Sequence, residues 1–247
     1  MRLKMGLNLT RNYSCNFDVK KRGKKNIKFI IVHYTGMKKE IKAIEKLKDY
    51  KSKVSSHYLI KKNGEILRLV PDLYIAWHAG QSSWKKLKSL NKYSIGIEIS
   101  NPGHNYTYKS FSFKQIVSIK KLLNFLIKKY QIKLDNILGH SDIAPLRKLD
   151  PGEKFPWNFL SKKGVAIWYP KIKFKTYDTS LKARRKIFFR NIHKIGYRFF
   201  YLSKKSNNDR KIIMAFQRRF LPKEVNGKIT DKTLQISQLL ALNFNFT

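Results

Sequence analysis

The stretch that decides the fold runs from Gly139 to Trp157 and reads GHSDIAPLRKLDPGEKFPW. Its three prolines exclude one long helix or a central strand, so the stretch is predicted to be a loop held in a fixed shape. His140 follows the short run DNIL, which could be a buried strand, and Asp150 comes later in the loop. An imidazole and a carboxylate on a stiff loop are two possible ligands of a metal ion such as zinc. From this stretch alone, a turn capped by Asp150 beside a core histidine is the alternative.

Two other apolar runs are predicted to be strands, and each carries a polar residue that could belong to the same site as His140. Ile27–His33, IKFIIVH, is nearly continuous and β-branched, as strands buried on both faces are, and it also ends in a histidine. Two such strands favour an arrangement in which both imidazoles meet at one edge of a sheet. Ser94–Ser100, SIGIEIS, alternates, so its isoleucines share one face and Glu98 lies on the other. Facing water, Glu98 would be an ordinary surface carboxylate; facing a metal-bound water, it would be a general base.

The elements between these strands predict the fold class. Apolar residues at helical spacing predict a helix over Ile41–Tyr50. Asn63-Gly64 between two apolar runs predicts a β-hairpin. Ser112 and Gln115 form a capping box before a long helix that ends near Tyr130. The order of strands and helices indicates an α/β domain with a mixed central β-sheet flanked by helices.

The chain changes character after residue 169. We predict an N-terminal arm (1–26), a catalytic domain (27–169), a linker (170–185) between separately packed units, and a helical domain (186–247). The last of these has three helical segments, around 187–195, 211–220 and 231–240, with Gly196 ending the first, Asp209 capping the second and Thr230 capping the third. Its segments ARRKIFFR and AFQRRF could bind nucleic acid, but phenylalanine at helical spacing is more often core.

Charge and cysteine content narrow the class of protein. Lys and Arg number 54 against 15 Asp and Glu, a net charge of +39, which suggests a polyanionic partner. The lysines are spread along the whole chain, however, so specific nucleic-acid binding is not favoured. The single cysteine, Cys15, excludes an internal disulfide and a cysteine-rich metal site. The first 25 residues lack the apolar run of a secretory signal, and no run is long enough to span a membrane, so a cytoplasmic protein is expected.

Taken together, the motifs resemble those of a known family. FIIVHYTGM, VSSHYLI, NGEI, AWHAG, SIGIEISNPGH, GHSDIAP and RKLDPGEKFPW resemble, in this order, zinc-dependent N-acetylmuramoyl-L-alanine amidases. That family includes muropeptide-recycling amidases and phage-lysozyme-type amidases, which are related to peptidoglycan recognition proteins. The resemblance covers about residues 14–168. The tail, with IGYRFF, AFQRRF and VNGKITDKTL, looks like the helical peptidoglycan-binding module often appended to such enzymes.

The resemblance implies a catalytic metal site. His33, His140 and Asp150 would bind one zinc ion per chain and leave a fourth position open for water. Glu98 matches the family's catalytic glutamate and would take a proton from that water. Lys148 matches its lysine and would stabilise the oxyanion of the tetrahedral intermediate.

The resemblance also implies a substrate cleft bordered by Tyr58, Trp77 and His78. It leaves His57 unassigned, and His104 and His193 are treated as ordinary polar residues. Cys15 departs from the family, because many relatives have proline there in a Ser-Pro-Asn arm. This difference concerns the conformation of the arm and not the chemistry.

The expected reaction is hydrolysis of the amide that joins the lactyl group of N-acetylmuramic acid to L-alanine of the peptidoglycan stem peptide. Its substrate would be intact peptidoglycan or a soluble 1,6-anhydro fragment. A catalytically inactive peptidoglycan-recognition protein is the first alternative; it would be expected to lack a ligand or the glutamate. A basic nucleic-acid-binding protein is the second; it explains the charge but not the ordered motifs. The sequence does not indicate an oligomeric state.

Overall fold

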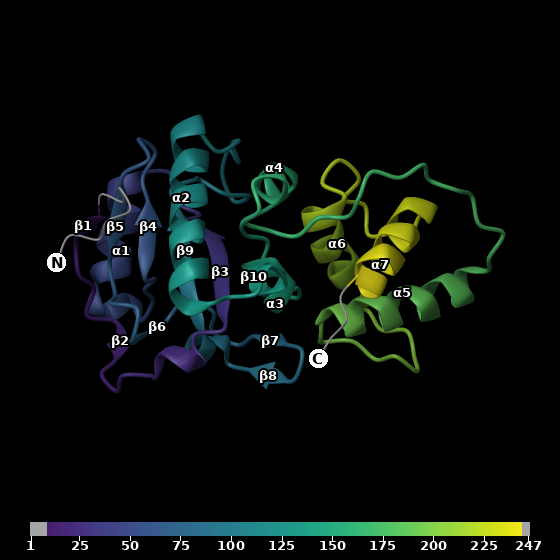
Figure 1. The fold of residues 1–247 in the computed structure, drawn as a ribbon, viewed down its shortest axis with the longest axis horizontal. Helices are drawn as coiled ribbons and strands as arrows, with labels where there is room; N and C mark the ends of the chain where they lie inside the picture. Colours follow the sequence, from purple (N-terminus) through teal and green to yellow (C-terminus); the bar gives the residue numbers. More distant parts are fainter. Residues whose placement is uncertain (1–8, 244–247) are drawn as a thin grey trace.

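A six-stranded mixed β-sheet lies at the centre of the chain, which this computed structural model describes from residue 9 to residue 243 (Figure 1). The strand order is β1-β5-β4-β9-β3-β10. Its strands are β1 (Leu9–Arg11), β3 (Phe29–Tyr34), β4 (Tyr58–Ile60), β5 (Ile66–Arg68), β9 (Ser94–Ile99) and β10 (Ile137–Gly139). β4, β9, β3 and β10 are parallel, β5 is antiparallel to β4, and β1 is parallel to β5. The predicted mixed sheet is therefore confirmed.

Four short strands form two small antiparallel ribbons beside this sheet. They are β2 (Phe17–Asp18) with β6 (Ile75–Ala76), and β7 (Ser83–Trp84) with β8 (Leu87–Lys88). Short 3-10 helices occur at Lys24–Asn26, Tyr50–Ser52, Leu90–Tyr93 and Leu134–Asn136. Among the described residues, no helix combines the length and the apolar character that a membrane crossing requires.

Three local predictions hold. β4 and β5 form the predicted antiparallel hairpin, and Gly64 in its turn has a φ of 87°, which favours glycine. α2 (Phe113–Tyr130) begins with the predicted capping box, in which Ser112 Oγ accepts from the Gln115 N–H and the Gln115 side chain accepts from the Ser112 N–H. α1 (Glu40–Lys48) occupies the predicted helix after β3.

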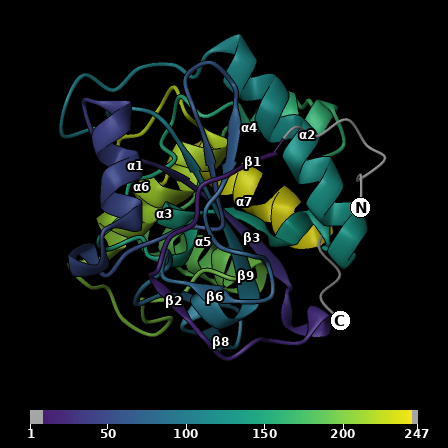
Figure 2. The same cartoon turned by 90° about the vertical axis from the view of Figure 1, so that its left-hand side faces the viewer.

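One face of the sheet is covered by α2 and α4 (Trp157–Lys162) (Figures 1 and 2). Side chains alternate along a strand, so Ile30 and Val32 of β3 and Ile95 and Ile97 of β9 point to this face. They belong to one buried hydrophobic cluster with residues of α2 and α4. This face is closed and apolar.

The opposite face is covered in two separate places. α1 covers the β4–β5 side, where Leu47 packs with Leu59 and Leu67. The short helix α3 (His140–Ile143) and the helical tail cover the β3–β10 side, where Ile31 and Leu138 share a buried cluster with tail residues. The carboxyl ends of the parallel strands β9 and β3 lie between these two covers. An open stretch of sheet edge at that point is where α/β proteins commonly bind ligands.

The tail contains the three predicted helices, α5 (Leu181–Ile195), α6 (Asp209–Phe220) and α7 (Asp231–Asn243). Gly196 ends α5 with a φ of 140°, and Thr230 Oγ1 accepts from the Thr233 N–H at the start of α7, both as predicted. Asp209 does not cap α6, because its carboxylate pairs with Arg185 of α5 instead. Residues 170–180 lack helix and strand, so the connecting segment is shorter than predicted.

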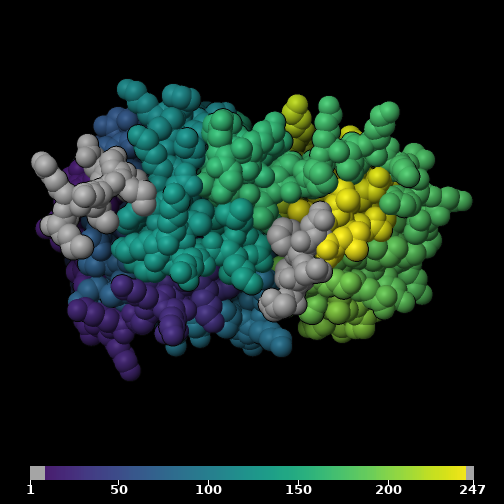
Figure 3. Space-filling view, viewed as in Figure 1, coloured from purple at the N-terminus to yellow at the C-terminus, as the bar shows by residue number. Residues whose placement is uncertain are grey.

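The helical tail is not packed separately from the sheet. Figure 3 shows its atoms lying directly against the sheet part of the molecule. Phe188 of α5 and Phe216 of α6 belong to the same buried cluster as Phe29 and Ile31 of β3. The prediction of two separately packed units is therefore corrected: the tail completes the hydrophobic core on one face of the sheet.

The segment 9–26 also differs from a loose arm. β1 pairs with β5, and the side chains of Asn16 and Arg22 are buried. Arg22 donates to the Asp72 carbonyl and approaches His57 Nε2 at 3.0 Å. This segment is thus part of the folded domain, and residues 1–8 of the predicted arm lie outside the described residues.

Candidate active site

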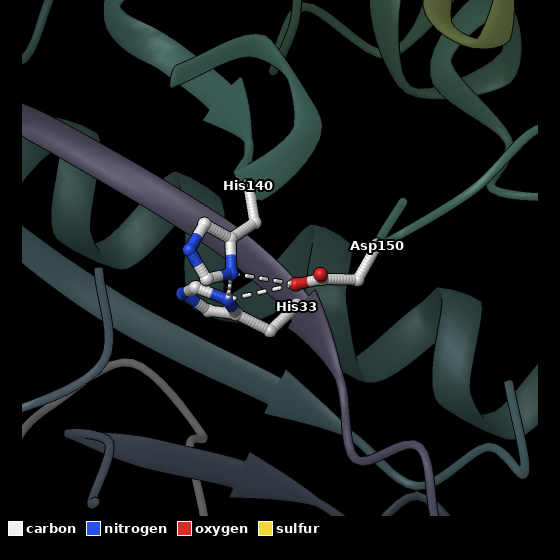
Figure 4. A group of neighbouring side chains, drawn as sticks. All are labelled: His33, His140 and Asp150. Atoms are coloured by element: carbon white, nitrogen blue, oxygen red, sulfur yellow. Dashed lines mark hydrogen bonds and ion pairs between the residues drawn. The ribbon is translucent and has the colours of Figure 1, made fainter. Parts of the chain in front are cut away.

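Three side chains converge between the two covers of the sheet (Figure 4). His33 Nδ1 lies 2.9 Å from His140 Nδ1 and 2.9 Å from Asp150 Oδ2, and His140 Nδ1 lies 3.0 Å from the same oxygen. All three residues are buried. Two imidazole nitrogens and one carboxylate oxygen therefore face one common point.

The fold brings these residues together through parallel strands. His33 lies near the carboxyl end of β3, and His140 directly follows β10, which pairs with β3. Asp150 comes from the proline-rich loop, whose backbone returns to the same place because the Ser141 N–H donates to the Asp150 carbonyl at 2.9 Å. This placement agrees with two predictions from the sequence. One is that His140 and Asp150 could both bind a metal ion, and the other is that the imidazoles of His33 and His140 meet at one edge of the sheet.

The tautomer of His140 follows from its second nitrogen. Nε2 lies 3.2 Å from the Ala79 carbonyl oxygen, so Nε2 carries the hydrogen and donates it there. Arg147 also approaches Nε2, at the longer distance of 3.4 Å. The lone pair of His140 is consequently on Nδ1, the atom that faces His33 and Asp150.

A chain of hydrogen bonds gives the same result for His33. The Ser94 hydroxyl donates to the Leu90 carbonyl at 2.6 Å, so Ser94 Oγ accepts from His78 Nε2 at 3.2 Å. His78 Nδ1 is then an acceptor, and His33 Nε2 donates to it at 3.0 Å. His33 Nδ1 is left with a lone pair. Two bare nitrogens only 2.9 Å apart repel each other unless a cation lies between them, and two nitrogens with one carboxylate oxygen suit catalytic zinc.

The electrostatics of the three residues also suit a divalent cation. Burial, reinforced by the neighbouring His140, lowers the pKa of His33 to about 4, so its imidazole is neutral at pH 7. Burial opposes ionisation of Asp150, but the neighbouring imidazoles of His140 and His33 favour its carboxylate form more strongly and hold the pKa of Asp150 well below its usual range. At pH 7 the group thus offers the neutral imidazole of His33 and the negative charge of Asp150.

Glu98 lies directly beside this group. It pairs in register with His33 across β9 and β3, so both side chains point to the same face of the sheet. Burial, with a contribution from the charge of Asp150, raises the pKa of Glu98 to about 8, although Lys148 acts in the opposite direction. Glu98 Oε2 is buried and has no hydrogen-bond partner among the described residues. A carboxyl group with a pKa near neutrality at a cavity wall is suited to proton transfer.

The group lines a cavity of about 410 Å³. The cavity wall includes all three converging residues and four of the five other predicted residues, namely Glu98, Lys148, Trp77 and His78. Trp77 is fixed by a hydrogen bond of 2.7 Å from its Nε1 to Asp18 Oδ1. His78 is 9% exposed, and its ring nitrogens contact Ser94 and His33.

The same wall contains residues that were not predicted from the sequence: Tyr34, Thr35, Lys46, Ser55, Asn105 and Arg147. Arg147 could have been predicted from the sequence, because it directly precedes Lys148 in the stretch 139–157.

The structure corrects the prediction for Tyr58, which is not part of the cavity wall. Tyr58 pairs with Ile97 and therefore points to the closed apolar face, opposite to Glu98. Its hydroxyl donates to Asp72 Oδ1 at 2.6 Å in the buried interior. A motif match identified the strand, but the face depends on the register of that strand against β9.

The remaining histidines, His57, His104 and His193, lie outside the converging group. His57 Nδ1 accepts from the Gly96 N–H at 2.9 Å, and its other nitrogen approaches Arg22. His104 connects Tyr34 to Glu153, at 2.9 Å and 3.0 Å, and is not among the cavity-lining residues. His193 is exposed on α5. None of the three contacts the converging group.

Comparison with known proteins agrees with this geometry. A family described as N-acetylmuramoyl-L-alanine amidase matches residues 23–153. N-acetylmuramoyl-L-alanine amidase AmiD of Escherichia coli K12 is 34% identical over 229 residues, which are 87% of this chain and 82% of that protein. 1,6-anhydro-N-acetylmuramyl-L-alanine amidase AmpD of Haemophilus influenzae is 39% identical over 109 residues, which are 44% and 57% of the two chains.

A solved structure extends the similarity through the helical tail. It is the complex of E. coli AmiD with anhydro-N-acetylmuramic acid-L-Ala-D-gamma-Glu-L-Lys, with a TM-score of 0.78 and 32% identity, and the match covers 89% of this chain and 90% of that one. The match of one family over more than half of the chain, and of one relative over most of it, is decisive. The chain belongs to the N-acetylmuramoyl-L-alanine amidase family.

Proposed function

We propose that this protein hydrolyses the amide bond between the lactyl group of N-acetylmuramic acid and L-alanine of the peptidoglycan stem peptide. The observation that carries the proposal is the convergence of His33 Nδ1, His140 Nδ1 and Asp150 Oδ2 within 3.0 Å of one another beside Glu98, in a cavity of about 410 Å³. The family membership supports the same bond as the target.

His33, His140 and Asp150 would hold one zinc ion. Zinc bound by such a set supplies Lewis-acid chemistry, which acidifies water and polarises a carbonyl group. Each of the three residues is held in its orientation by a second hydrogen bond. His33 donates to His78, His140 donates to the Ala79 carbonyl, and the Asp150 carbonyl accepts from the Ser141 N–H.

Glu98 and Lys148 would perform the proton transfer and the charge stabilisation. Glu98 takes a proton from the attacking water as the water oxygen bonds to the carbonyl carbon. The same carboxyl group then passes that proton to the leaving nitrogen of L-alanine as the C–N bond breaks. The Lys148 ammonium stabilises the oxyanion that forms from the carbonyl oxygen. Trp77 and His78 line the wall against which the substrate lies.

The substrate class we propose is a peptidoglycan fragment that contains N-acetylmuramic acid or its 1,6-anhydro form. Support comes from E. coli AmiD, whose solved complex contains an anhydro-N-acetylmuramic acid peptide, and from AmpD, whose name specifies the 1,6-anhydro sugar.

The helical tail, residues 186–247, is proposed as a peptidoglycan-binding element that would favour polymeric substrate. The cytoplasmic location stays a prediction from the sequence, which cell fractionation tests.

Mass spectrometry of the products tests the function. Purified protein with one equivalent of zinc should release free stem peptide from 1,6-anhydro-N-acetylmuramoyl peptide, and the same incubation with intact peptidoglycan would show whether the polymer is also a substrate. A protein that binds both substrates and releases peptide from neither would instead be the catalytically inactive recognition protein. The presence of Glu98 and Lys148 beside all three ligands favours the enzyme.

A further inference from the structure

Asp142 connects the candidate metal site to the helical tail. It lies two residues after His140 in the one-turn helix α3 and is 1% exposed. Its Oδ2 accepts from the Gly139 N–H at 2.8 Å and from Arg219 of α6 at 2.6 Å. Its Oδ1 accepts from the Tyr197 hydroxyl, just after α5, at 2.5 Å. Two of the three hydrogen bonds to this carboxylate therefore come from the tail.

Arg219 holds the other side of the same segment. Its second terminal nitrogen donates to the Ile137 carbonyl at 2.9 Å, at the beginning of β10. Its guanidinium lies 4.3 Å from the centre of the Trp157 ring. With side-chain exposures of 2% and 1%, Arg219 and Asp142 form a fully buried ion pair. Arg219 thus bonds to residues on both sides of His140, one before and one after it.

The segment that carries His140 has little stability of its own. Within residues 9–243, β10 is an edge strand of three residues that pairs only with β3, and α3 has four residues. So short a strand and so short a helix depend on tertiary contacts for a fixed position. Figure 1 shows β10 at the edge of the sheet that is nearest the helical tail, with α3 beside it on the side of the tail. The tail therefore provides the outer support of this segment.

The position of Tyr197 is fixed by close packing. Gly196 has a φ of 140°, and a Cβ atom there would lie 2.4 Å from the Trp84 ring. The Gly196 carbonyl accepts from the Lys85 N–H at 2.8 Å, and Tyr197 packs edge-to-face on Trp84 with ring centres 4.8 Å apart. The end of α5 is thus bound to the β7–β8 ribbon in one register, and this register delivers the tyrosine hydroxyl to Asp142.

We infer that the helical tail is a positioning element of the metal site: Arg219 and Tyr197 hold Asp142, and through Asp142 they fix the turn that presents His140 to the metal. This inference rests on the proposed zinc site. It gives the tail a role in holding the metal that is separate from any binding of the peptidoglycan polymer.

The test measures the zinc dissociation constant of the full-length protein by competition with a chromophoric chelator. Arg219→Met removes the ion pair and should weaken zinc binding by about tenfold or more, the range found when groups behind metal ligands are removed. Tyr197→Phe removes one oxygen atom and should weaken it less, in the same direction. Arg219→Lys, which can still donate one charged hydrogen bond to Asp142, should recover part of the affinity.

Arg185→Met is the matched control, because it breaks another largely buried arginine–aspartate pair of the tail. Arg185 Nε lies 2.7 Å from Asp209 Oδ2, and this pair joins α5 to α6 without reaching α3. Its zinc dissociation constant should equal that of the parent. An equal loss of affinity in Arg185→Met would overturn the inference, because general loosening of the tail would then explain the result.

The other outcomes are equally decisive. A folded Arg219→Met with the parent's zinc affinity overturns the inference. Should Arg219→Met fail to fold, Tyr197→Phe decides alone, and an unchanged dissociation constant in that variant overturns it. A parent protein that binds no zinc refutes the proposed function instead, and the two failures are therefore distinguishable.

Discussion

Replacing Glu98 with glutamine tests the chemistry and the electrostatics of the site together. Glutamine has nearly the same shape but accepts no proton, so amide cleavage should fall by on the order of 10²-fold or more, the typical contribution of a positioned general base. Zinc content should stay at the parent level, because Glu98 is not among the three residues proposed to bind the metal. Loss of zinc from this variant would show that the ligand assignment is wrong, and cleavage at the parent rate would show that Glu98 is not the base.

The stability of the metal-free protein provides an independent magnitude. The pKa of Glu98 is raised from 4.5 to about 8, mainly by burial. At 1.36 kcal/mol per pKa unit, this difference corresponds to at most ~5 kcal/mol, and water in the cavity reduces it, so we expect ~1–3 kcal/mol. Below pH 4.5 the group is protonated in the folded and unfolded states, and no penalty arises. Between pH 4.5 and 8 the unfolded state loses its proton first, so folding stability is lost as pH rises through this window.

The assay is urea unfolding of chelator-treated protein at pH values from 4.5 to 8.5. Relative to the parent, Glu98→Gln should gain stability progressively across this range. Glu45→Gln, on the exposed side of α1 with 53% side-chain exposure, is the control and should not gain in this way. A constant difference in unfolding free energy between Glu98→Gln and the parent at all pH values would refute the burial argument.

Four further outcomes follow from the structure. Asp150→Ala should release zinc, measured by elemental analysis, and abolish turnover, because two imidazoles alone bind the ion weakly. Lys148→Ala should keep zinc and lower kcat on the order of 10²-fold, with little change in KM, because an oxyanion partner acts mainly in the transition state. His78→Phe should weaken zinc binding by on the order of tenfold, and His78→Asn, whose oxygen can accept from His33, should recover part of it. A chain ending at Lys173 should be largely insoluble, because it exposes the cluster around Phe29 and Ile31; a soluble, folded product with parent activity would contradict this.

The sequence alone determined the elements whose signals are local. The Asn63-Gly64 turn, the Ser112–Gln115 capping box and the alternation of Ser94–Ile99 depend on residues only a few positions apart, so their patterns were legible without a fold. The strands ending at His33 and before His140 pointed to a common edge of the sheet, because parallel strands bring their carboxyl ends together. The proposed set of metal ligands and the proposed catalytic roles came from the resemblance to a family and not from spacing.

The tertiary structure decided everything that depends on register and distant contacts. Tyr58 and Glu98 lie on neighbouring strands, yet the pairing of Tyr58 with Ile97 places them on opposite faces, and a shift of one residue would reverse this. Asp142 and Arg219 are 77 positions apart, and neither residue type indicates that a buried pair will join them. Only the packing of α6 against α3 removes both charges from water and makes each depend on the other. For this reason the tail reads in sequence as a separate unit but is, in the folded molecule, part of the core beside His140.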